Sequence, residues 1–441
     1  MQRTSRSSIL VSANQRVYVT DRFAAHRLLV SDAAVGGALS DRPPSIVPSA
    51  VLSRRRHYNI NLAPYGPLWR AIRRNLAAEI LHSSRLRRYA LARSRALDGL
   101  IGHRRPRPAA CRRRGPRRRE PPRRRVRPAR QDVLRRWRRR RRRRAGHGQH
   151  PGRPCPVLPR PPRLRHAPRR HRAPLSPPVE EAKGGDGDPL AYVDTLVDLR
   201  VPNENGNGSQ RGRRRRRLLA DGELVGLCSE FLDAGTEPAA AALQWIMAPL
   251  VKRPDTQRAL REEIDAAVGE VGEEVLGKLE YLNAVIMEGL RLHPTVPMVL
   301  RQVMSDDDVV LDGRRLPAGT AVHFPLARLA RDETAWAHPR EFRPERFMAG
   351  GEGEGVSLVV ATGSAGEIRM MPFGAGRRMC PGMGAAVLHL GYFVANLVRE
   401  FEWAEEEGDA VDLQPHHGFF TVMKRPLRAR LVRRRPEAKT C

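Results

Sequence analysis

The sequence predicts a mainly α-helical protein with small β-sheets. Apolar residues recur at helical spacing over residues 66–101, and residues 221–250 form a long, nearly continuous apolar segment. Residues 308–324 instead alternate between apolar and polar side chains around turn residues, which is typical of a small hairpin. A helical fold with strands confined to a few short segments accounts for all three patterns.

The first part of the chain begins with a predicted strand and helix over residues 17–31. In residues 66–101, the side chains of Trp69, Ile72 and Leu76 fall on one helix face, which predicts amphipathic helices packed on a core. This part of the fold ends at about residue 102, where the apolar periodicity stops.

Regular patterns return at residue 221. We expect one long helix over 221–250, amphipathic helices over 255–268 and 279–293, and a further helix directly after Cys380. Pro294 ends the helix before it, because proline cannot donate its backbone hydrogen bond.

The positive charge of the chain is concentrated in one segment. Residues 103–172 hold 30 arginines against two acidic residues, a net charge of +28 out of the +34 of the 441-residue chain, which leaves +6 for the rest. This segment is rich in arginine and proline and has too few apolar residues to offset the entropy of ordering. We therefore expect residues 103–178 to be low-complexity and disordered, and residues 203–217 to form a second polar linker.

The cysteines favour neither a disulfide framework nor a zinc site, because none lie in paired or CxxC spacing. This usage is typical of a reducing, cytosol-facing environment. No apolar run is long enough for a transmembrane helix, and the first residues lack the apolar core of a signal peptide. The five cysteines are Cys111, Cys155, Cys228, Cys380 and Cys441.

Cys380 stands in an unusual setting, the sequence FGAGRRMCPG from Phe373 to Gly382, directly before an apolar helix. A thiolate can be the axial ligand of haem iron. Glycines allow the backbone to approach such a ligand closely, and the N–H groups at a helix N-terminus stabilise negative charge. The spacing of phenylalanine, glycines, arginine and cysteine makes a metal-ligating thiolate more plausible than an inert buried cysteine.

Three further patterns precede this motif. Glu288 and Arg291 stand three residues apart on one helix face, and Arg346 of the sequence PERF can complete a buried charged network with them. Trp69 and Arg73 lie one helical turn apart, and both can donate hydrogen bonds to a carboxylate. Each pattern alone is common on ordinary helices, so their joint occurrence carries the argument.

Together these motifs resemble the cytochrome P450 family, the haem-thiolate monooxygenases. The similarity covers residues 1–102 and 179–435, and stretches such as NLAPYGPLWRAIRRNL and EFLDAGTEPAAAALQW resemble plant microsomal members. The resemblance implies a single large haem domain with the P450 fold, made by these two parts of the chain. Because residues 103–172 stand where family members have several helices, that domain is expected to be partly incomplete.

The resemblance also implies roles for individual residues around haem b. Cys380 would be the axial metal ligand, within a loop that includes Phe373 and Gly382. Ala234 and Gly235 would line the opposite, distal face of the haem, where Thr236 and Glu237 would deliver protons. Glu288, Arg291 and Arg346 would form a structural triad. The expected donors to the haem propionates are Trp69, Arg73, Arg301 and Arg378.

The reaction implied by the family is insertion of one atom of dioxygen into a small apolar organic molecule. Electrons would come from NADPH through the flavoprotein NADPH–cytochrome P450 reductase. Relatives sit on the endoplasmic reticulum membrane facing the cytosol, held by an anchor helix and a proline-rich hinge. Neither is present here, so we expect a chain truncated at its N-terminus.

Two departures from the family pattern keep alternatives open. Pro238 follows Glu237 where family members carry a threonine hydroxyl. This leaves three alternatives: proton delivery through Thr236 or water, loss of electrons as peroxide, or dioxygen-independent chemistry as an isomerase or dehydratase. The 103–172 segment suggests either a reading-frame slip in a GC-rich gene, which the transcript would reveal, or an arginine-rich nucleic-acid-binding protein. Against nucleic-acid binding, no zinc-finger or helix-turn-helix pattern accompanies the arginines, and we expect no specific nucleic-acid partner.

Overall fold

The chain divides into two compact units, residues 1–98 with 189–441, and residues 99–188. Of the second unit, the structure describes only residues 99–102, the end of one helix. The arginine-rich segment, for which we expect disorder, lies outside the described residues. The computed structural model describes residues 9–11, 16–31, 38–43, 59–102, 191–203, 216–267, 272–304, 309–311, 313–359 and 366–434.

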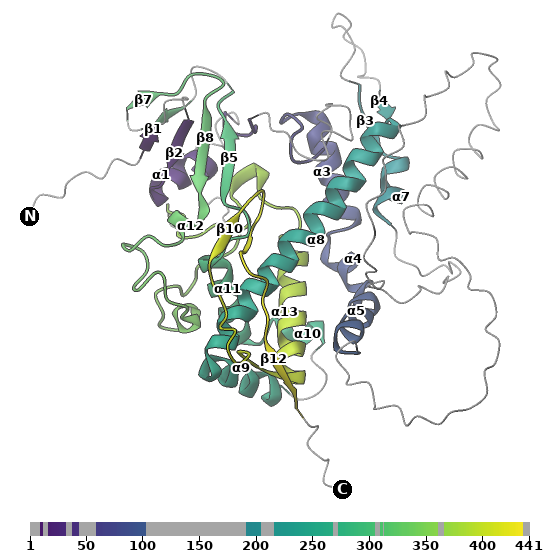
Figure 1. The fold of residues 1–441 in the computed structure, drawn as a ribbon. Coiled ribbons are helices and arrows are strands. Elements are labelled where there is room, and N and C mark those ends of the chain that lie inside the picture. The colour runs from purple at the N-terminus through teal and green to yellow at the C-terminus, as the bar shows by residue number, and fades with distance from the viewer. Residues whose placement is uncertain are drawn as a thin grey trace, which may run out of the picture. The chain divides into compact units, whose positions relative to one another are not determined.

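Helices are the main regular elements of the first unit, and the longest is the predicted apolar one, α8 (Figure 1). The α-helices are α1 (Arg22–His26), α3 (Pro67–Glu79), α4 (Ser83–Arg87), α5 (Ala90–Gly102), α7 (Tyr192–Val197), α8 (Asp221–Lys252), α9 (Pro254–Ala266), α10 (Glu273–Leu276), α11 (Glu280–Leu292), α12 (Leu326–Leu329) and α13 (Met383–Glu400). Short π or 3-10 turns are η1 (Arg27–Ser31), η3 (Pro344–Phe347) and η4 (Gly376–Arg378).

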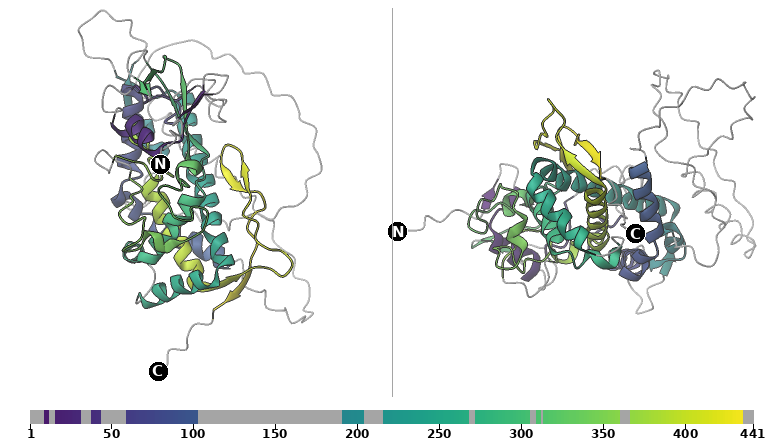
Figure 2. Two further views of the ribbon diagram at one scale, coloured as in Figure 1. Left: turned by 90° about the vertical axis from the view of Figure 1, so that its left-hand side faces the viewer. Right: turned by 90° about the horizontal axis from the view of Figure 1, so that it is seen from below.

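The strands are short and form small sheets, as the sequence predicts. The largest sheet has the order β1-β2-β8-β5, in which β2 and β8 run parallel and the other neighbours run antiparallel. Figure 2 shows the C-terminal strands, drawn in yellow, to one side of the helices. The strands are β1 (Ile9–Val11), β2 (Arg16–Val19), β3 (Arg200–Pro202), β4 (Arg216–Leu218), β5 (Met298–Gln302), β6 (Val310–Leu311), β7 (Arg314–Arg315), β8 (Ala321–Pro325), β9 (Phe401–Ala404), β10 (Pro415–His417), β11 (Thr421–Met423) and β12 (Arg430–Arg433).

The hairpin expected over residues 308–324 is shorter than predicted. Only β6 and β7 pair within it, while β8 leaves the hairpin and pairs with β2 and β5. Val322 and Phe324 of β8 are fully buried there, in the same core as Val17 and Val19 of β2. Burial of these apolar side chains is the physical reason why the last strand joins a distant sheet rather than its sequence neighbour.

The centre of the fold is a contact among α8, α11 and α13, which all touch one another. Trp245 and Ile246 of α8 are fully buried at this contact. Gly289 of α11 allows the close approach, because a Cβ atom there would lie 2.5 Å from Cγ1 of Ile246. The two helices can therefore pack closely only while residue 289 lacks a side chain.

Glu288 and Arg291 of α11 join Arg346 of η3 in one buried network. Glu288 and Arg291 are 0% exposed, and Arg346 is 3% exposed. Both oxygens of Glu288 accept from Arg291, at 2.6 and 2.8 Å, and Oε1 also accepts Nε of Arg346 at 3.1 Å. The backbone N–H of Arg343 donates to the same oxygen at 2.9 Å. This carboxylate thus joins α11 to the segment that contains η3.

Arg291 also binds that segment directly. Its Nη1 donates to the carbonyl oxygens of Ala330 and Pro339 at 2.8 and 2.9 Å. The guanidiniums of Arg291 and Arg346 lie 5.1 and 5.8 Å from the ring centre of the buried Trp336. Since each charge and most of its hydrogen-bonding groups are paired, the network can persist without water.

Gly289→Ala is expected to lower the free energy of unfolding. Overpacking against Ile246 costs about 1–3 kcal/mol, whereas alanine gains only about 1 kcal/mol in helix propensity. Denaturant unfolding measures the difference. Gly384→Ala in α13 is the matched control, because nothing lies within 4 Å of its added Cβ, and it should be neutral or stabilising. Equal effects of both substitutions would contradict the close approach of α8 and α11.

Glu288→Gln is expected to destabilise the fold by about 3–5 kcal/mol, because it leaves two buried guanidiniums without their shared carboxylate. The unfolding free energy of Glu262→Gln provides the baseline, since Glu262 lies exposed on α9 and surface substitutions usually change stability by less than about 0.5 kcal/mol. A loss below 1 kcal/mol for Glu288→Gln would show that water reaches the network.

Candidate haem site

Cys380 lies two residues after η4 and three before α13, in a loop closed by its own backbone. Its N–H donates to the carbonyl oxygen of Phe373 at 2.8 Å. Gly374 and Gly376 have φ angles of 74° and 68°, a region that side chains rarely adopt. A Cβ at Gly376 would also overlap the carbonyl oxygen of Leu29, so the glycines of the motif are required by the loop geometry.

The surroundings of the Cys380 thiol act on its charge in opposite directions. Burial has the largest effect and leaves the pKa of the thiol raised, while the backbone N–H of Gly382 and the guanidiniums of Arg73 and Arg42 act to lower it. Gly382 is the N-cap residue of α13, so the sulfur lies at the N-terminus of an 18-residue helix. Positive potential from that helix end and from two arginines favours a thiolate once a cation can bind it.

Trp69 and Arg73 of α3 lie at this loop, although they are far from it in sequence. Arg73 donates to the carbonyl oxygen of Met379, next to Cys380. The Trp69 ring lies 5.5 Å from the guanidinium of Arg73 and 4.7 Å from that of Arg378. Its indole N–H donates to the carbonyl oxygen of Ile60 at 3.0 Å. The structure therefore brings together three of the predicted propionate donors.

Arg378 is buried and makes hydrogen bonds within the protein. It donates to the carbonyl oxygens of Ser40 and Ala63, both at 2.6 Å, and to that of Ile60 at 3.2 Å. It also forms an ion pair with Asp41 at 3.1 Å. Four of the five N–H groups of Arg378 are thus used within the protein, which leaves one Nη1 donor for a propionate.

Arg301 of β5 completes the predicted set. It is 2% exposed, and it donates to the carbonyl oxygens of Leu300 and Ala375 at 2.9 and 3.1 Å. Burial and the charges of Arg42 and Arg378 lower its pKa well below the usual value for arginine. The charge of Arg301 therefore interacts with the charges of Arg42 and Arg378.

Two residues of this region were missed by the sequence reasoning. Arg42 lies near Cys380, Arg73 and Arg378, and burial followed by repulsion from Arg378 lowers its pKa to about 10. Glu230 of α8 faces Arg42 and Arg378, and burial raises its pKa to about 7. No motif or helical spacing marks either residue, since both reach the site through contacts between segments distant in sequence.

We call Arg42, Arg73, Arg301 and Arg378 the arginine cluster. Two carboxylates, Asp41 and Glu230, face it in the described part of the chain. The buried Nε of Arg42 has no hydrogen-bond partner among the described residues. Four guanidiniums against two carboxylates, with one buried donor unused, leave room for further negative charge. Together with the single thiol of Cys380, this donor set fits haem, which carries two propionates and accepts a thiolate ligand.

The distal residues lie together on one stretch of α8. Ala234, Gly235, Thr236 and Glu237 are all exposed in the cofactor-free structure, as is Leu232 one turn earlier. The hydroxyl of Thr236 donates to the carbonyl oxygen of Leu232 at 2.7 Å. The helix continues through Pro238. The exposed stretch of residues 232–237, which includes the apolar Leu232, Ala234 and Gly235, provides a surface that a planar cofactor can cover.

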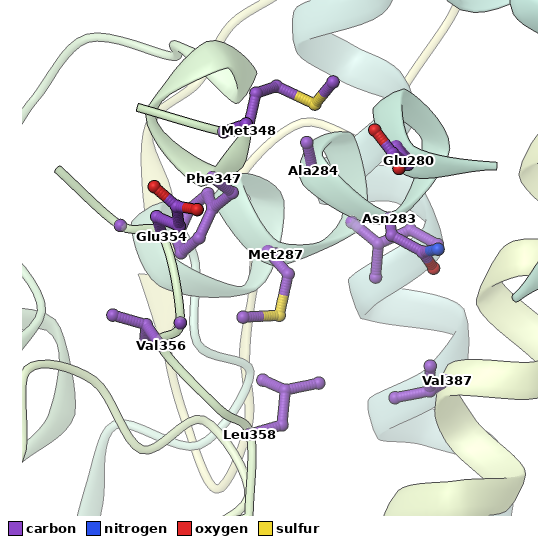
Figure 3. A pocket seen from close by; sticks show the side chains of 14 residues that line it. Glu280, Asn283, Ala284, Met287, Phe347, Met348, Glu354, Val356, Leu358 and Val387 are labelled. Atoms are coloured by element: carbon purple, nitrogen blue, oxygen red, sulfur yellow. The ribbon is translucent and has the colours of Figure 1, made fainter. Parts of the chain in front are cut away.

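A separate cavity of about 560 Å³ lies elsewhere, between α11, residues 347–358 and α13 (Figure 3). Apolar side chains such as Met287 and Leu358 line it, with carboxylates at Glu280 and Glu354. None of the predicted site residues borders this cavity.

Across the described ranges, no helix is long and apolar enough to cross a membrane. The described residues also contain no group of three or more His, Cys, Asp or Glu side chains that could hold a metal ion.

Comparisons with known proteins agree with the motifs. The chain is 36% identical to cytochrome P450 89A9 of Arabidopsis thaliana over 474 residues, which cover 96% of this chain and 86% of the relative. It is 33% identical to flavonoid 3'-monooxygenase of Arabidopsis thaliana over 226 residues, 51% of this chain and 41% of the relative. Such relatives are oxidoreductases that use haem.

The fold is shared with solved structures. A zebrafish cytochrome P450 solved with progesterone has a TM-score of 0.62 and 18% identity, with 97% of this chain and 96% of that chain covered. A second zebrafish P450 structure, solved with abiraterone, has a TM-score of 0.63. A family model described as cytochrome P450 matches residues 179–432. The chain therefore belongs to the cytochrome P450 family.

Proposed function

We propose that this chain is a haem-thiolate monooxygenase that binds haem b through Cys380. The observation that carries the proposal is the position of this thiol, at the N-terminus of α13 and beside Arg73 and Arg42. Haem b with a thiolate ligand supplies the oxidising chemistry that places one atom of dioxygen into a substrate and the other into water. The domain would consist of residues 1–102 and 179–435, with residues 103–178 outside it.

Each residue of the site has a distinct task in this proposal. Cys380 would ligate the iron, with Phe373 and Gly382 forming the loop around the sulfur. Ala234 and Gly235 would cover the distal face, where the exposed side of α8 excludes water from a small apolar substrate. The donors to the propionates would be Arg73, Arg301 and Arg378, joined by Arg42, and also Trp69 once its single indole N–H leaves the Ile60 carbonyl oxygen.

Proton delivery would depend on Thr236 and Glu237. The Glu237 carboxylate is exposed and can exchange protons with solvent. The Thr236 hydroxyl has its proton directed at the Leu232 carbonyl oxygen, so it must rotate to donate elsewhere. Pro238 offers neither a hydroxyl nor an N–H, which leaves the Ala234 carbonyl oxygen without its usual helical donor. A water bound at that carbonyl would connect Thr236 and Glu237.

Electrons would come from NADPH through NADPH–cytochrome P450 reductase. The loop around Cys380, residues 373–382, is called the cysteine loop. Its exposed Arg377 donates to the Tyr65 hydroxyl at 2.6 Å. The Tyr65 ring also lies 5.4 Å from the guanidinium of Arg70, so a positive surface suited to an acidic partner borders the site. By family resemblance, the enzyme would work on the cytosolic face of the endoplasmic reticulum membrane.

The same distal residues support a second candidate, a dioxygen-independent isomerase or dehydratase with the same haem. Pro238 lacks the hydroxyl that assists dioxygen chemistry, and the Thr236 hydroxyl is already engaged. An oxygenated substrate such as an organic hydroperoxide would need no such proton delivery. Turnover of a hydroperoxide without NADPH and reductase would favour this candidate, whereas NADPH-dependent product carrying an atom of labelled dioxygen would exclude it.

Nucleic-acid binding by the arginine-rich segment remains a separate prediction, because that segment lies outside the described residues. The family match over residues 179–432 does not include it. Haem content separates the two proposals better than salt dependence, since a chain with +34 net charge should bind nucleic acid nonspecifically in either case.

Cys380→Ser is expected to abolish the strongly red-shifted Soret band of the dithionite-reduced protein under carbon monoxide. A serine hydroxyl does not replace a thiolate as the electron-donating ligand. Cys228→Ser is the matched control, since Cys228 lies on α8 outside the cysteine loop, and it should keep the band. A red-shifted band in Cys380→Ser, or its absence from the unsubstituted holoprotein, would refute thiolate ligation by Cys380.

Pro238→Thr is expected to lower the hydrogen peroxide released per NADPH consumed in the presence of reductase. The new hydroxyl restores a proton donor on the distal face, so fewer electrons escape as peroxide. Pro249→Ala removes the other proline of α8, away from the exposed stretch, and should leave the ratio unchanged. If both substitutions give the same ratio as the unsubstituted enzyme, the side chain at position 238 does not govern proton delivery.

A further inference from the structure

Glu230 extends from α8 to a turn that precedes α3. Its two carboxylate oxygens accept the backbone N–H groups of Ile60 and Asn61, at 2.8 and 2.7 Å. Two backbone donors on one carboxylate fix the turn in both position and orientation. The distal helix is thereby tied to a segment 170 residues earlier in the chain.

This turn also holds two of the predicted propionate donors and Arg42, which the sequence reasoning missed. The carbonyl oxygen of Ile60 accepts both the indole N–H of Trp69 and Nη1 of Arg378, at 3.0 and 3.2 Å. The side-chain oxygen of Asn61 accepts Nη1 of Arg42. Glu230 therefore acts on these donors through the backbone of residues 60 and 61, without contacting the cysteine loop itself.

Charge links Glu230 to the same donors. The charged and titratable groups that face it are Arg42 from residues 38–43, Arg378 from the cysteine loop and Tyr192 from α7. Burial raises the pKa of Glu230 to about 7, against the lowering effect of the two backbone N–H groups and the two guanidiniums. The buried Tyr192 hydroxyl has no hydrogen-bond partner among the described residues.

Two added carboxylates change this balance. Propionates at Arg42 and Arg378 neutralise the guanidiniums that favour an ionised Glu230, and they repel its negative charge. Both effects favour the protonated acid. Although burial lowers the pKa of Arg42 and Arg301, an arginine guanidinium in a protein stays protonated at neutral pH, so these groups take up no proton themselves. Glu230 is then the group near the cluster whose protonation responds to the arriving charge.

We propose that Glu230 is a positioning residue that holds the turn at residues 60 and 61 for the propionate donors and takes up a proton from solvent when two carboxylates enter the arginine cluster. This inference rests on the proposed haem site. The carboxylate becomes a neutral acid and one solvent proton is consumed, with no other change in bonding.

Linkage sets the direction of the effect. In the free protein Glu230 is protonated below about pH 7 and ionised above it. If bound propionates raise its pKa, their affinity is highest at low pH and falls as pH rises through the pKa of the free protein. The fall is about tenfold for each unit by which binding raises the pKa.

The experiment uses metal-free protoporphyrin IX, which carries both propionates but cannot ligate Cys380, so no proton is released from the thiol. Quenching of tryptophan fluorescence measures its affinity for the full chain between about pH 6 and about pH 9, over which one unit of pKa change appears as a tenfold effect. Calorimetry in buffers of different ionisation enthalpy counts the protons taken up. Protoporphyrin IX dimethyl ester is the uncharged comparison ligand.

The unsubstituted protein should take up protons when it binds protoporphyrin IX, but not when it binds the dimethyl ester. Glu230→Gln should remove the pH dependence of affinity that protoporphyrin IX shows and its dimethyl ester does not. Asp233→Asn, which removes an exposed charge on the same helix, should retain it. Calorimetry on the unsubstituted chain tests proton uptake even if Glu230→Gln fails to fold.

Three outcomes are distinguishable. Proton uptake that depends on the propionates and on Glu230 supports the proposal. Binding of both porphyrins without that uptake, or equal pH profiles for the unsubstituted protein and Glu230→Gln, overturns it and leaves the haem site standing. Failure of protoporphyrin IX itself to bind overturns the haem site and this inference together.

Discussion

The buried carboxylate of Glu288 is the acceptor on which the cysteine side of this fold depends. It receives four hydrogen bonds from Arg291, Arg346 and the backbone of Arg343. Without it, Arg291 would remain in the interior with no counter-charge, and Arg346 would keep only its ion pair with the partly exposed Glu352, at a cost of several kcal/mol. The network therefore holds α11 and η3 in one arrangement, and the chain continues from there to the cysteine loop.

The arginine cluster has the opposite character, because its positive charge is not fully matched by carboxylates. Glu288 and Glu352 balance Arg291 and Arg346 within the protein, whereas Asp41 and Glu230 leave the four guanidiniums of the arginine cluster with excess positive charge. Buried guanidiniums without enough counter-charge are costly, and an anionic cofactor relieves that cost on binding. In the proposed function, one set of arginines therefore serves structural stability and a separate set serves cofactor affinity.

The distal helix combines both roles. Its buried C-terminal half packs on α11 and α13, while its exposed middle presents Ala234–Glu237. Pro238 interrupts the hydrogen-bond ladder between these parts, and the helix still continues because burial of residues such as Trp245 outweighs one missing hydrogen bond. The departure from the family pattern therefore alters the local chemistry without altering the path of the helix.

The sequence by itself determined the helical class, the family and the loop around Cys380, because glycines with positive φ and helical periodicity are local properties. The association of Trp69, Arg73 and Arg378 was also predictable, although only through resemblance to a family. Tertiary structure alone decided the roles of Arg42 and Glu230 and the hydrogen bonds that occupy Trp69 and Arg378 at Ile60. Electrostatic interactions act through space, so residues far apart in the chain can share charge while no spacing in the sequence records it.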